Sequence, residues 1–485
     1  MVKNDLNSKI GQATRWSATT EIIAKLISPL VNMVLARLLT PNEFGVVATI
    51  TMVISFAEIF TDAGFQKYLI QHEFRDVEEL NKNTNVAFWT NLFVSGVICV
   101  IIFFFRDSVA RLVGNPALGK TISVSSILII IAAFSSVQMA RYKRDFDFKT
   151  LFFVRVGTCL VPLVVTLPLA FVLRNYWALL IGNFASQLFN AIVLTVKSKW
   201  RPSLFYSFKI LKEMLSFSIW TFFEMFFFWL TLNVGIFIVG HYLDDYYLGL
   251  YKTSMTVVNS YVSIISAAII PVLFSALSRY QNDEVNFMNT YYTFQRMAAI
   301  LLIPMGVGIY MYSDLVTLIL LGKQWMEASG FIGLWGLTSA IVMVYANFAG
   351  EVYRSKGHPK IALGVQVLHL IFVVPTIFFT VEQDFKILYT ARALVRVQMI
   401  ITSLILMHVL YKFIIKDVIK NTFPMIISTS IMACIAYVLK KFHTSIGWQI
   451  GTIIICGMVY FLVLFICFPK IRREVFKKKY NIRAK

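Results

Sequence analysis

The sequence is poor in charged residues, and above all in acidic ones. Asp and Glu number 25 in 485 residues, and all charged residues together make up 14%. A soluble globular protein carries about 25% charged residues, because they cover the surface that faces water. Apolar residues make up 58% of this chain, and its mean hydropathy is +0.72. These values exclude a set of soluble domains and predict a chain embedded in a membrane.

Motifs of enzymatic chemistry and cofactor binding are also lacking. The sequence has no phosphate-binding loop of the form GxxxxGK[ST], and no HExxH, CxxC or GxSxG motif. Its five cysteines lie in apolar stretches without paired spacing, which argues against disulfides and cysteine metal sites. No loop is long enough to fold as a catalytic domain. We therefore expect no metal, no cofactor and no catalytic residue. An enzyme that uses only side chains within the membrane is the alternative.

Long apolar runs are what the sequence has in abundance. A transmembrane helix needs about 20 predominantly apolar residues, and open sheet edges do not occur in lipid. The runs therefore predict an all-α membrane protein of about fourteen transmembrane helices. The predicted spans are 17–39, 44–62, 84–105, 121–140, 151–173, 176–196, 213–240, 246–274, 291–312, 328–350, 361–380, 388–411, 421–439 and 448–468.

Lys and Arg are distributed unevenly between the two sides of these spans. With the N-terminus inside, the inner segments carry 30 of the 45 basic residues and the outer segments carry 9. Cytoplasmic loops hold the excess of Lys and Arg, so we expect a multi-pass inner-membrane protein with both termini in the cytoplasm. The net charge of +20 then reflects topology and not nucleic-acid binding. The basic tail 470–485 is expected to touch anionic lipids.

Several charged residues fall inside the predicted spans, where charge is costly and marks either pairing or function. Glu21 and Lys25 are one helical turn apart, which fits a structural ion pair and the lining of a site equally well. Glu58, Glu224 and Lys252 lie deeper, and for these we favour a functional role. Snorkelling of the side chain to the membrane surface is the preferred interpretation for four arginines near span ends, Arg155, Arg296, Arg392 and Arg396.

The stretches that follow spans 1 and 7 are similar to each other. Three identities recur there at an offset of 204 residues, and both stretches form the first hairpin of a block of six spans. Spans 1 and 7 point the same way, so the repeat predicts two lobes related by an axis along the membrane normal. The aligned pairs are Leu39 with Leu243, Gly45 with Gly249, and Thr49 with Thr253.

Five stretches spread over most of the chain carry a family resemblance. They are LARLLTPNEFGVVATI (Leu35–Ile50), FTDAGFQKYLIQ (Phe60–Gln71), GLYKTSMTVVN (Gly249–Asn259), PVLFSALSRYQ (Pro271–Gln281) and YRSKGHPK (Tyr353–Lys360). The sequence thereby resembles the Wzx-type polysaccharide and lipopolysaccharide flippases of the oligosaccharidyl-lipid/polysaccharide exporter (MATE-like) superfamily. The resemblance implies two six-helix lobes around a central cavity lined mainly by spans 1, 2, 7 and 8. We expect the lobes to comprise 1–200 and 201–412, followed by two extra spans in 413–469 and the tail 470–485.

The function implied by this resemblance is the export of undecaprenyl-diphosphate-linked oligosaccharide units for a surface polysaccharide: lipopolysaccharide, exopolysaccharide or teichuronic acid. The lobes would alternate in access to the two sides, with a proton or sodium ion as the coupling ion. A multidrug or cation antiporter of the same fold is the alternative, and a polytopic membrane enzyme of the same pathway is a further one. The expected substrate-binding residues are Lys25, Lys252, Arg37 and Arg155, and the expected ion-coupling residues are Glu58, Glu224, Glu21 and Asp62.

Overall fold

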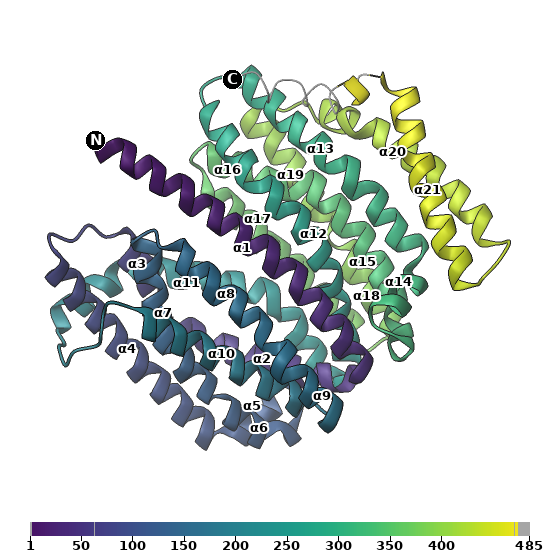
Figure 1. Ribbon diagram of the computed structural model, residues 1–485. Helices are drawn as coiled ribbons and strands as arrows, with labels where there is room; N and C mark the ends of the chain where they lie inside the picture. Colours follow the sequence, from purple (N-terminus) through teal and green to yellow (C-terminus); the bar gives the residue numbers. More distant parts are fainter. Residues whose placement is uncertain (1, 63, 470, 474–485) are drawn as a thin grey trace. The chain divides into compact units, whose positions relative to one another are not determined.

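The computed structural model describes residues 2–62, 64–469 and 471–473, and these residues form helices and short connections with no β-strand (Figure 1). The helices up to the middle of the chain are α1 (Val2–Leu38), α2 (Pro41–Asp62), α3 (Phe65–Gln71), α4 (Val77–Phe104), α5 (Arg106–Leu112), α6 (Gly119–Ser125), α7 (Ile127–Arg144), α8 (Phe148–Val161), α9 (Leu167–Leu173), α10 (Trp177–Lys197) and α11 (Phe208–Tyr242). Those that follow are α12 (Asp245–Arg279), α13 (Glu284–Met311), α14 (Ser313–Leu320), α15 (Ser329–Val342), α16 (Phe348–Ser355), α17 (Pro359–Thr380), α18 (Phe385–Leu394), α19 (Val397–Tyr411), α20 (Ile415–Lys440) and α21 (Ile446–Cys467).

Within the described residues, thirteen helical segments are long and apolar enough to cross a membrane. They contain or closely overlap the predicted spans from the second onward, which confirms the all-α membrane fold. The predicted first span, 17–39, falls on α1, part of whose side chains lie outside the described residues. The predicted number of fourteen spans is therefore approximate. One span is built from α8 and α9, joined through a π-helical turn at Pro162–Thr166, where proline cannot donate a backbone hydrogen bond.

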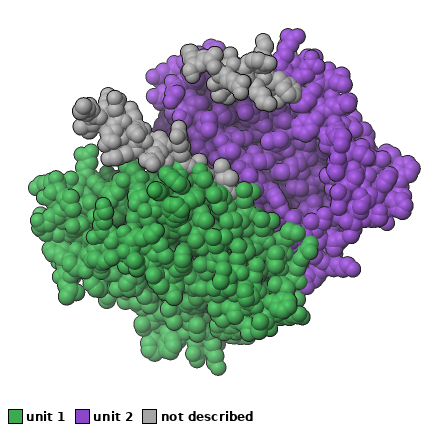
Figure 2. Space-filling model, in the orientation of Figure 1, with its two compact units in different colours: residues 1–253, 377–383 green, residues 254–376, 384–485 purple. Residues whose placement is uncertain are grey.

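The chain divides into two compact units, which Figure 2 shows in different colours. Unit 1 comprises residues 1–253 and 377–383, and unit 2 comprises 254–376 and 384–485. Helix α11 belongs to unit 1 because it packs on α2 and α3. This packing boundary falls later than the predicted lobe boundary at 200. The predicted lobes are defined by the repeat and not by packing, so they stay a prediction.

The two units bury their apolar side chains differently. In unit 2, one continuous core joins α13, α15, α16, α19, α20 and α21, with the large side chains of Tyr291, Phe348 and Tyr460 fully buried in it. In unit 1, smaller clusters lie between particular helices. One surrounds Phe65 and Phe88, and another packs Leu35 of α1 against α9 and α10. The core of unit 2 is thus shared by most of its helices.

The hairpins α1–α2 and α11–α12 correspond to each other almost residue for residue. Helix α1 ends at Leu38 and α11 at Tyr242, while α2 begins at Pro41 and α12 at Asp245, so both bounds recur at the offset of 204 residues. The backbone N–H groups of Leu39 and Leu243 each close the last turn of the preceding helix, at 2.9 and 2.8 Å. The two hairpins thus share their helix boundaries at the offset of the sequence repeat.

Two glycines bring the equivalent helices α2 and α12 into close contact. A Cβ atom added at Gly45 would overlap the carbonyl oxygen of Asp245, and one added at Gly249 would overlap that of Pro41. Pro41 and Asp245 are themselves equivalent in the repeat, so the contact is reciprocal. The side-chain amide of Asn115 donates a hydrogen bond to Asp245 at the same turn. Only glycine permits backbones to approach this closely.

Candidate functional site

All eight predicted site residues belong to unit 1. The structure describes the side chains of five of them. Those of Glu21, Asp62 and Glu224 lie outside the described residues, although α1, α2 and α11 carry them. Lys25, Glu58 and Lys252 are half-buried, whereas Arg37 and Arg155 are exposed. The half-buried residues are thus the stronger candidates for a site at membrane depth.

Helix α1 is held along α8 and α9, and this packing sets the position of Lys25. At one end the Trp16 ring lies 4.9 Å from the Phe152 ring, and at the other Val31 and Leu35 pack into the cluster with α9 and α10. Lys25 lies between these two anchored stretches and is half-buried. Because α1 is anchored on both sides of Lys25, the backbone at this residue is held in place. A lysine held at membrane depth suits the binding of an anion.

Aromatic side chains of helices α2 and α11 pack against each other. The indole nitrogen of Trp229 donates a hydrogen bond to Ser55 Oγ at 2.9 Å, and the Phe56 ring lies 4.8 Å from the Trp229 ring. One turn further along, the rings of Phe60 and Phe222 are 5.3 Å apart. Glu58 is two residues from each of Phe56 and Phe60 on α2, and so lies on another side of this helix. The rings give α2 and α11 a flat apolar face.

Lys252 lies three residues after Gly249, on α12. Its neighbours Tyr251 and Thr253 are buried, and the close approach of Tyr251 Oη to Gly235 fixes α12 against α11. Lys252 itself is half-buried. This packing fixes the backbone of α12 at Lys252. It thereby limits the region that the ammonium group of Lys252 can reach.

Unit 2 contains a cationic cluster that sequence reasoning missed. The guanidinium carbons of Arg392 and Arg396 lie 5.0 and 4.0 Å from the ring of Trp335, and Arg396 donates a hydrogen bond of 2.6 Å to Ser339 Oγ. Trp335 in turn donates to Asn259 at 3.2 Å. Arg392 is only 7% exposed, so the snorkelling predicted for it is wrong. The cation–π contacts keep it inside, since an aromatic face attracts a desolvated cation.

No group of three or more metal-ligating side chains occurs among the described residues. The polar groups at membrane depth are separate ammonium, guanidinium, carboxyl and hydroxyl groups.

Solved structures of transporters share this fold. The chain matches the lipid II flippase MurJ in an inward closed conformation with a TM-score of 0.76 and 14% identity, over 95% of this chain and 100% of that one. It matches an inward-facing multidrug resistance MATE family transporter of the MOP superfamily with a TM-score of 0.59 and 12% identity, over 83% and 96%. The fold is therefore that of a multi-pass membrane protein built like these transporters.

Comparison of sequences identifies the family. It belongs to the family described as polysaccharide biosynthesis protein, which matches residues 34–330. A membrane protein in the cps region of Klebsiella pneumoniae is 22% identical over 97% of both chains. The lipopolysaccharide biosynthesis protein WzxC of Escherichia coli (strain K12) is 21% identical over 77% of this chain and 75% of its own. The succinoglycan biosynthesis transport protein ExoT of Rhizobium meliloti (strain 1021) is 24% identical over 65% and 63%. The resemblance noted in the sequence is confirmed.

Proposed function

We propose that this protein is a flippase and not an enzyme, and that it moves undecaprenyl-diphosphate-linked oligosaccharide units across the inner membrane for a surface polysaccharide. Membership of the polysaccharide biosynthesis family carries the proposal. The relatives WzxC and ExoT, named for lipopolysaccharide biosynthesis and succinoglycan transport, support it. The half-buried cations of unit 1 add a physical reason, because a diphosphate entering a low-dielectric site needs positive partners.

Within this function, Lys25 and Lys252 hold the diphosphate. Both are half-buried, and both lie on helices of the repeated hairpins. Arg37 and Arg155 are exposed and meet the diphosphate as it arrives or leaves. The aromatic face of α2 and α11 offers rings to the sugars. Two lobes, 1–200 and 201–412, rock about this site and open it to one side of the membrane at a time, while 413–469 adds two spans.

A coupling ion, either a proton or sodium, drives the cycle. Glu58 takes it up, since its side chain is half-buried on α2. Glu224, Glu21 and Asp62 are the further candidates on the same three helices, α11, α1 and α2. A carboxyl group at membrane depth gains most from neutralisation by an ion, because burial disfavours its bare charge.

Both termini lie in the cytoplasm in this proposal, as the excess of Lys and Arg in the inner loops indicates. The basic tail 470–485 then lies at the cytoplasmic leaflet and meets anionic lipids. Labelling of single cysteines introduced near Lys3 and Lys485 tests this arrangement. Labelling of the two ends from opposite sides of the membrane would contradict it.

Reconstitution tests the function directly. Purified protein in vesicles loaded with lipid-linked oligosaccharide should make the sugars on the inner leaflet accessible to an external glycosidase. Vesicles without protein provide the control. No gain in accessibility, together with uptake or release of an organic cation, would instead identify a multidrug antiporter of the same fold.

A further inference from the structure

The connection between α10 and α11, residues 198–207, exposes large apolar side chains at one end of unit 1. Leu204 is 96% exposed, and Phe208, which begins α11, is 79% exposed. The structure describes every side chain from residue 194 to 216, so this exposure is a property of the described segment. Large apolar side chains gathered on a surface mark a site of contact with another apolar surface.

Hydrogen bonds to α4 hold this connection in a fixed position. The side-chain amide of Asn85 donates to Ser203 Oγ at 2.7 Å and accepts from the Ser203 backbone N–H at 3.0 Å. The indole nitrogen of Trp89 donates to the Ser203 carbonyl at 2.8 Å. Leu204 therefore follows a residue whose backbone N–H and C=O are both bonded to α4.

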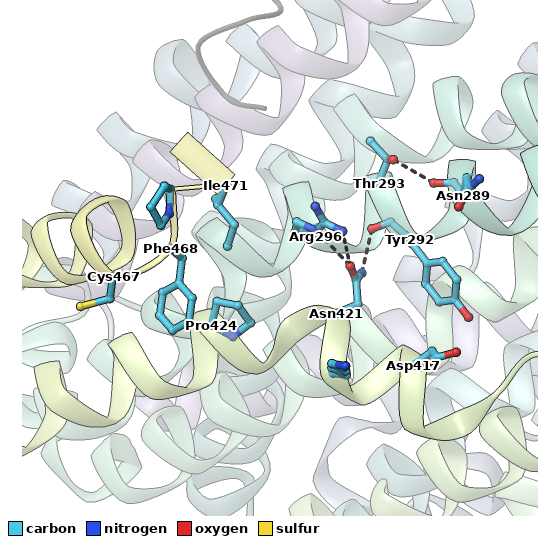
Figure 3. Close-up of a pocket in the computed structure, with 12 residues that line it drawn as sticks. Asn289, Tyr292, Thr293, Arg296, Asp417, Asn421, Pro424, Cys467, Phe468 and Ile471 are labelled. Atoms are coloured by element: carbon cyan, nitrogen blue, oxygen red, sulfur yellow. Dashed lines mark hydrogen bonds between the residues drawn. The ribbon is translucent and has the colours of Figure 1, made fainter. Parts of the chain in front are cut away.

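An asparagine plays a comparable role in unit 2, where Asn421 ties α20 to α13 (Figure 3). Its oxygen accepts hydrogen bonds from Arg296, and its nitrogen donates to the Tyr292 carbonyl at 2.8 Å. Both partners there are helices, which their own backbone hydrogen bonds already hold. In unit 1 the amide of Asn85 fixes a segment that has no helical hydrogen bonds of its own.

Apolar packing fixes the inner side of the same connection. Trp200 is buried, and its ring lies 5.7 Å from the ring of Phe88 on α4. Phe205 packs against the same cluster of buried side chains. Because Trp200 and Phe205 point inward, their neighbours Leu204 and Phe208 are directed outward by the packing of the segment.

The place of the connection along α4 corresponds to the edge of the hydrocarbon layer. A run of exposed apolar side chains on α4 begins at Phe93, four residues or about 6 Å after Trp89. The headgroup region of a bilayer is about 5–7 Å thick on each side. On α10, the exposed apolar run ends at Val196, just before the connection. The connection therefore lies at the level of the headgroups, where Trp and Tyr side chains are enriched.

Basic side chains flank the exposed apolar ones. Arg201 caps the end of α10, donating to the carbonyls of Val196 at 3.1 Å and Ser198 at 2.8 Å. Glu213 is the acidic residue of the stretch 194–216. Lysines near the membrane surface attract anionic headgroups, while their apolar stems lie along the hydrocarbon. The exposed lysines of this stretch are Lys197, Lys199, Lys209 and Lys212.

We propose that the connection 198–207 and the first turn of α11 form an anchor in the lipid leaflet at this end of the spans. Leu204 and Phe208 insert between the acyl chains, and the flanking lysines hold the headgroups of anionic phospholipids. The anchor fixes the level of three spans, because the connection is bonded to α4 and continuous with α10 and α11. It does so whichever molecule the protein transports.

Photo-cross-linking of the full chain tests the proposal. Leu204→p-benzoylphenylalanine places a photoreactive ketone on the exposed segment, and the protein is irradiated in cell membranes and in vesicles of equal phosphatidylglycerol and phosphatidylcholine. Mass spectrometry should find lipid adducts, with phosphatidylglycerol in roughly fivefold excess, the preference that one lysine near an anionic surface confers. Glu73→p-benzoylphenylalanine is the control and should form no lipid adduct, because α4 begins only after Glu73 and about 18 Å before Trp89.

A lysine variant tests the charged part of the anchor. Lys199→Gln combined with Lys209→Gln should bring the two lipids close to equal yield, while the adduct at position 204 persists. Lys416→Gln combined with Lys420→Gln is the matched control, since both are exposed lysines of α20 in unit 2, and it should leave the fivefold excess unchanged.

Three outcomes would overturn the proposal. Adducts with a protein in cell membranes would show that a partner chain covers Leu204. The absence of any adduct would place this side chain in water. An excess of phosphatidylglycerol that survives the loss of Lys199 and Lys209 would remove the lysines from lipid binding. All three substituted side chains are exposed, so the variants keep the core of unit 1 intact.

Discussion

The two units place charge at membrane depth in different ways. In unit 1, half-buried groups of both signs, Lys25, Glu58 and Lys252, lie on three different helices. In unit 2, Arg392 and Arg396 stack on one tryptophan, and Arg296 is held by a neutral amide. An aromatic face attracts a cation and helps to hold it in place. Charges of both signs on separate helices suit a role that changes during a cycle. On the proposed function, the charges of unit 1 serve transport, whereas those of unit 2 serve stability.

The largest expected effect tests the transport side of this comparison. Lys252→Ala should lower export per protein roughly a hundredfold, since a hydrogen bond to a charged group is worth about 3 kcal/mol. The abundance of the variant protein in the membrane should stay normal. Lys252→Arg should keep part of the activity because the charge survives in a different geometry. Export of lipid-linked sugar, normalised to membrane protein, is the measurement. Normal export by Lys252→Ala would remove the residue from the site.

The next effect concerns the predicted pair Glu21 and Lys25. If the two side chains neutralise each other, removing either charge alone should destabilise the protein by about 3–5 kcal/mol and lower its abundance, because the remaining charge then lacks compensation. Removing both should restore abundance. If Lys25 holds the diphosphate, as proposed, the abundant double variant will be inactive in the same export assay. A fully active double variant would reduce the pair to a structural role.

A smaller effect is expected from the cationic cluster of unit 2. Trp335→Leu removes the ring on which Arg392 and Arg396 stack, and should cost about 2 kcal/mol of stability. The thermal midpoint in detergent should fall, while export per folded protein stays close to normal. Trp448→Leu, at a tryptophan that is 38% exposed, is the matched control and should change the midpoint less. Loss of export without loss of stability would show instead that the cluster takes part in transport.

The smallest effect belongs to a unit 2 charge outside the membrane spans. The backbone N–H and side-chain amide of Asn286 donate to Asp283, at 3.1 and 2.6 Å, and hold the pKa of this carboxyl below its ordinary value. Its contribution to stability is therefore present above the ordinary pKa and is lost as pH falls through the lowered pKa. Asp283→Asn should flatten the acid end of the stability profile slightly. An unchanged profile would show that the cap is not used.

Features of the fold that are encoded in neighbouring residues could be predicted from the sequence. Contacts between residues far apart in the sequence could not. The spans followed from apolar runs, because helix formation in lipid is decided along the chain. A repeat of a few residues marked the hairpins that follow spans 1 and 7. Arg396 and Ser339 are 57 residues apart, and Arg296 and Asn421 are 125 apart. Nothing in either stretch indicates its partner. Snorkelling was a reasonable expectation for Arg392 near a span end, and it is wrong because α15 presents Trp335 there.

The glycine contact between α2 and α12 has the form of an interface between two identical subunits. In a two-fold dimer, residue i of one copy meets residue j of the other, and j meets i. Gly45 meets Asp245 and Gly249 meets Pro41 in this manner within one chain. Each of the two hairpins therefore depends on the glycine of the other, because a side chain added at either position would push apart the same pair of helices.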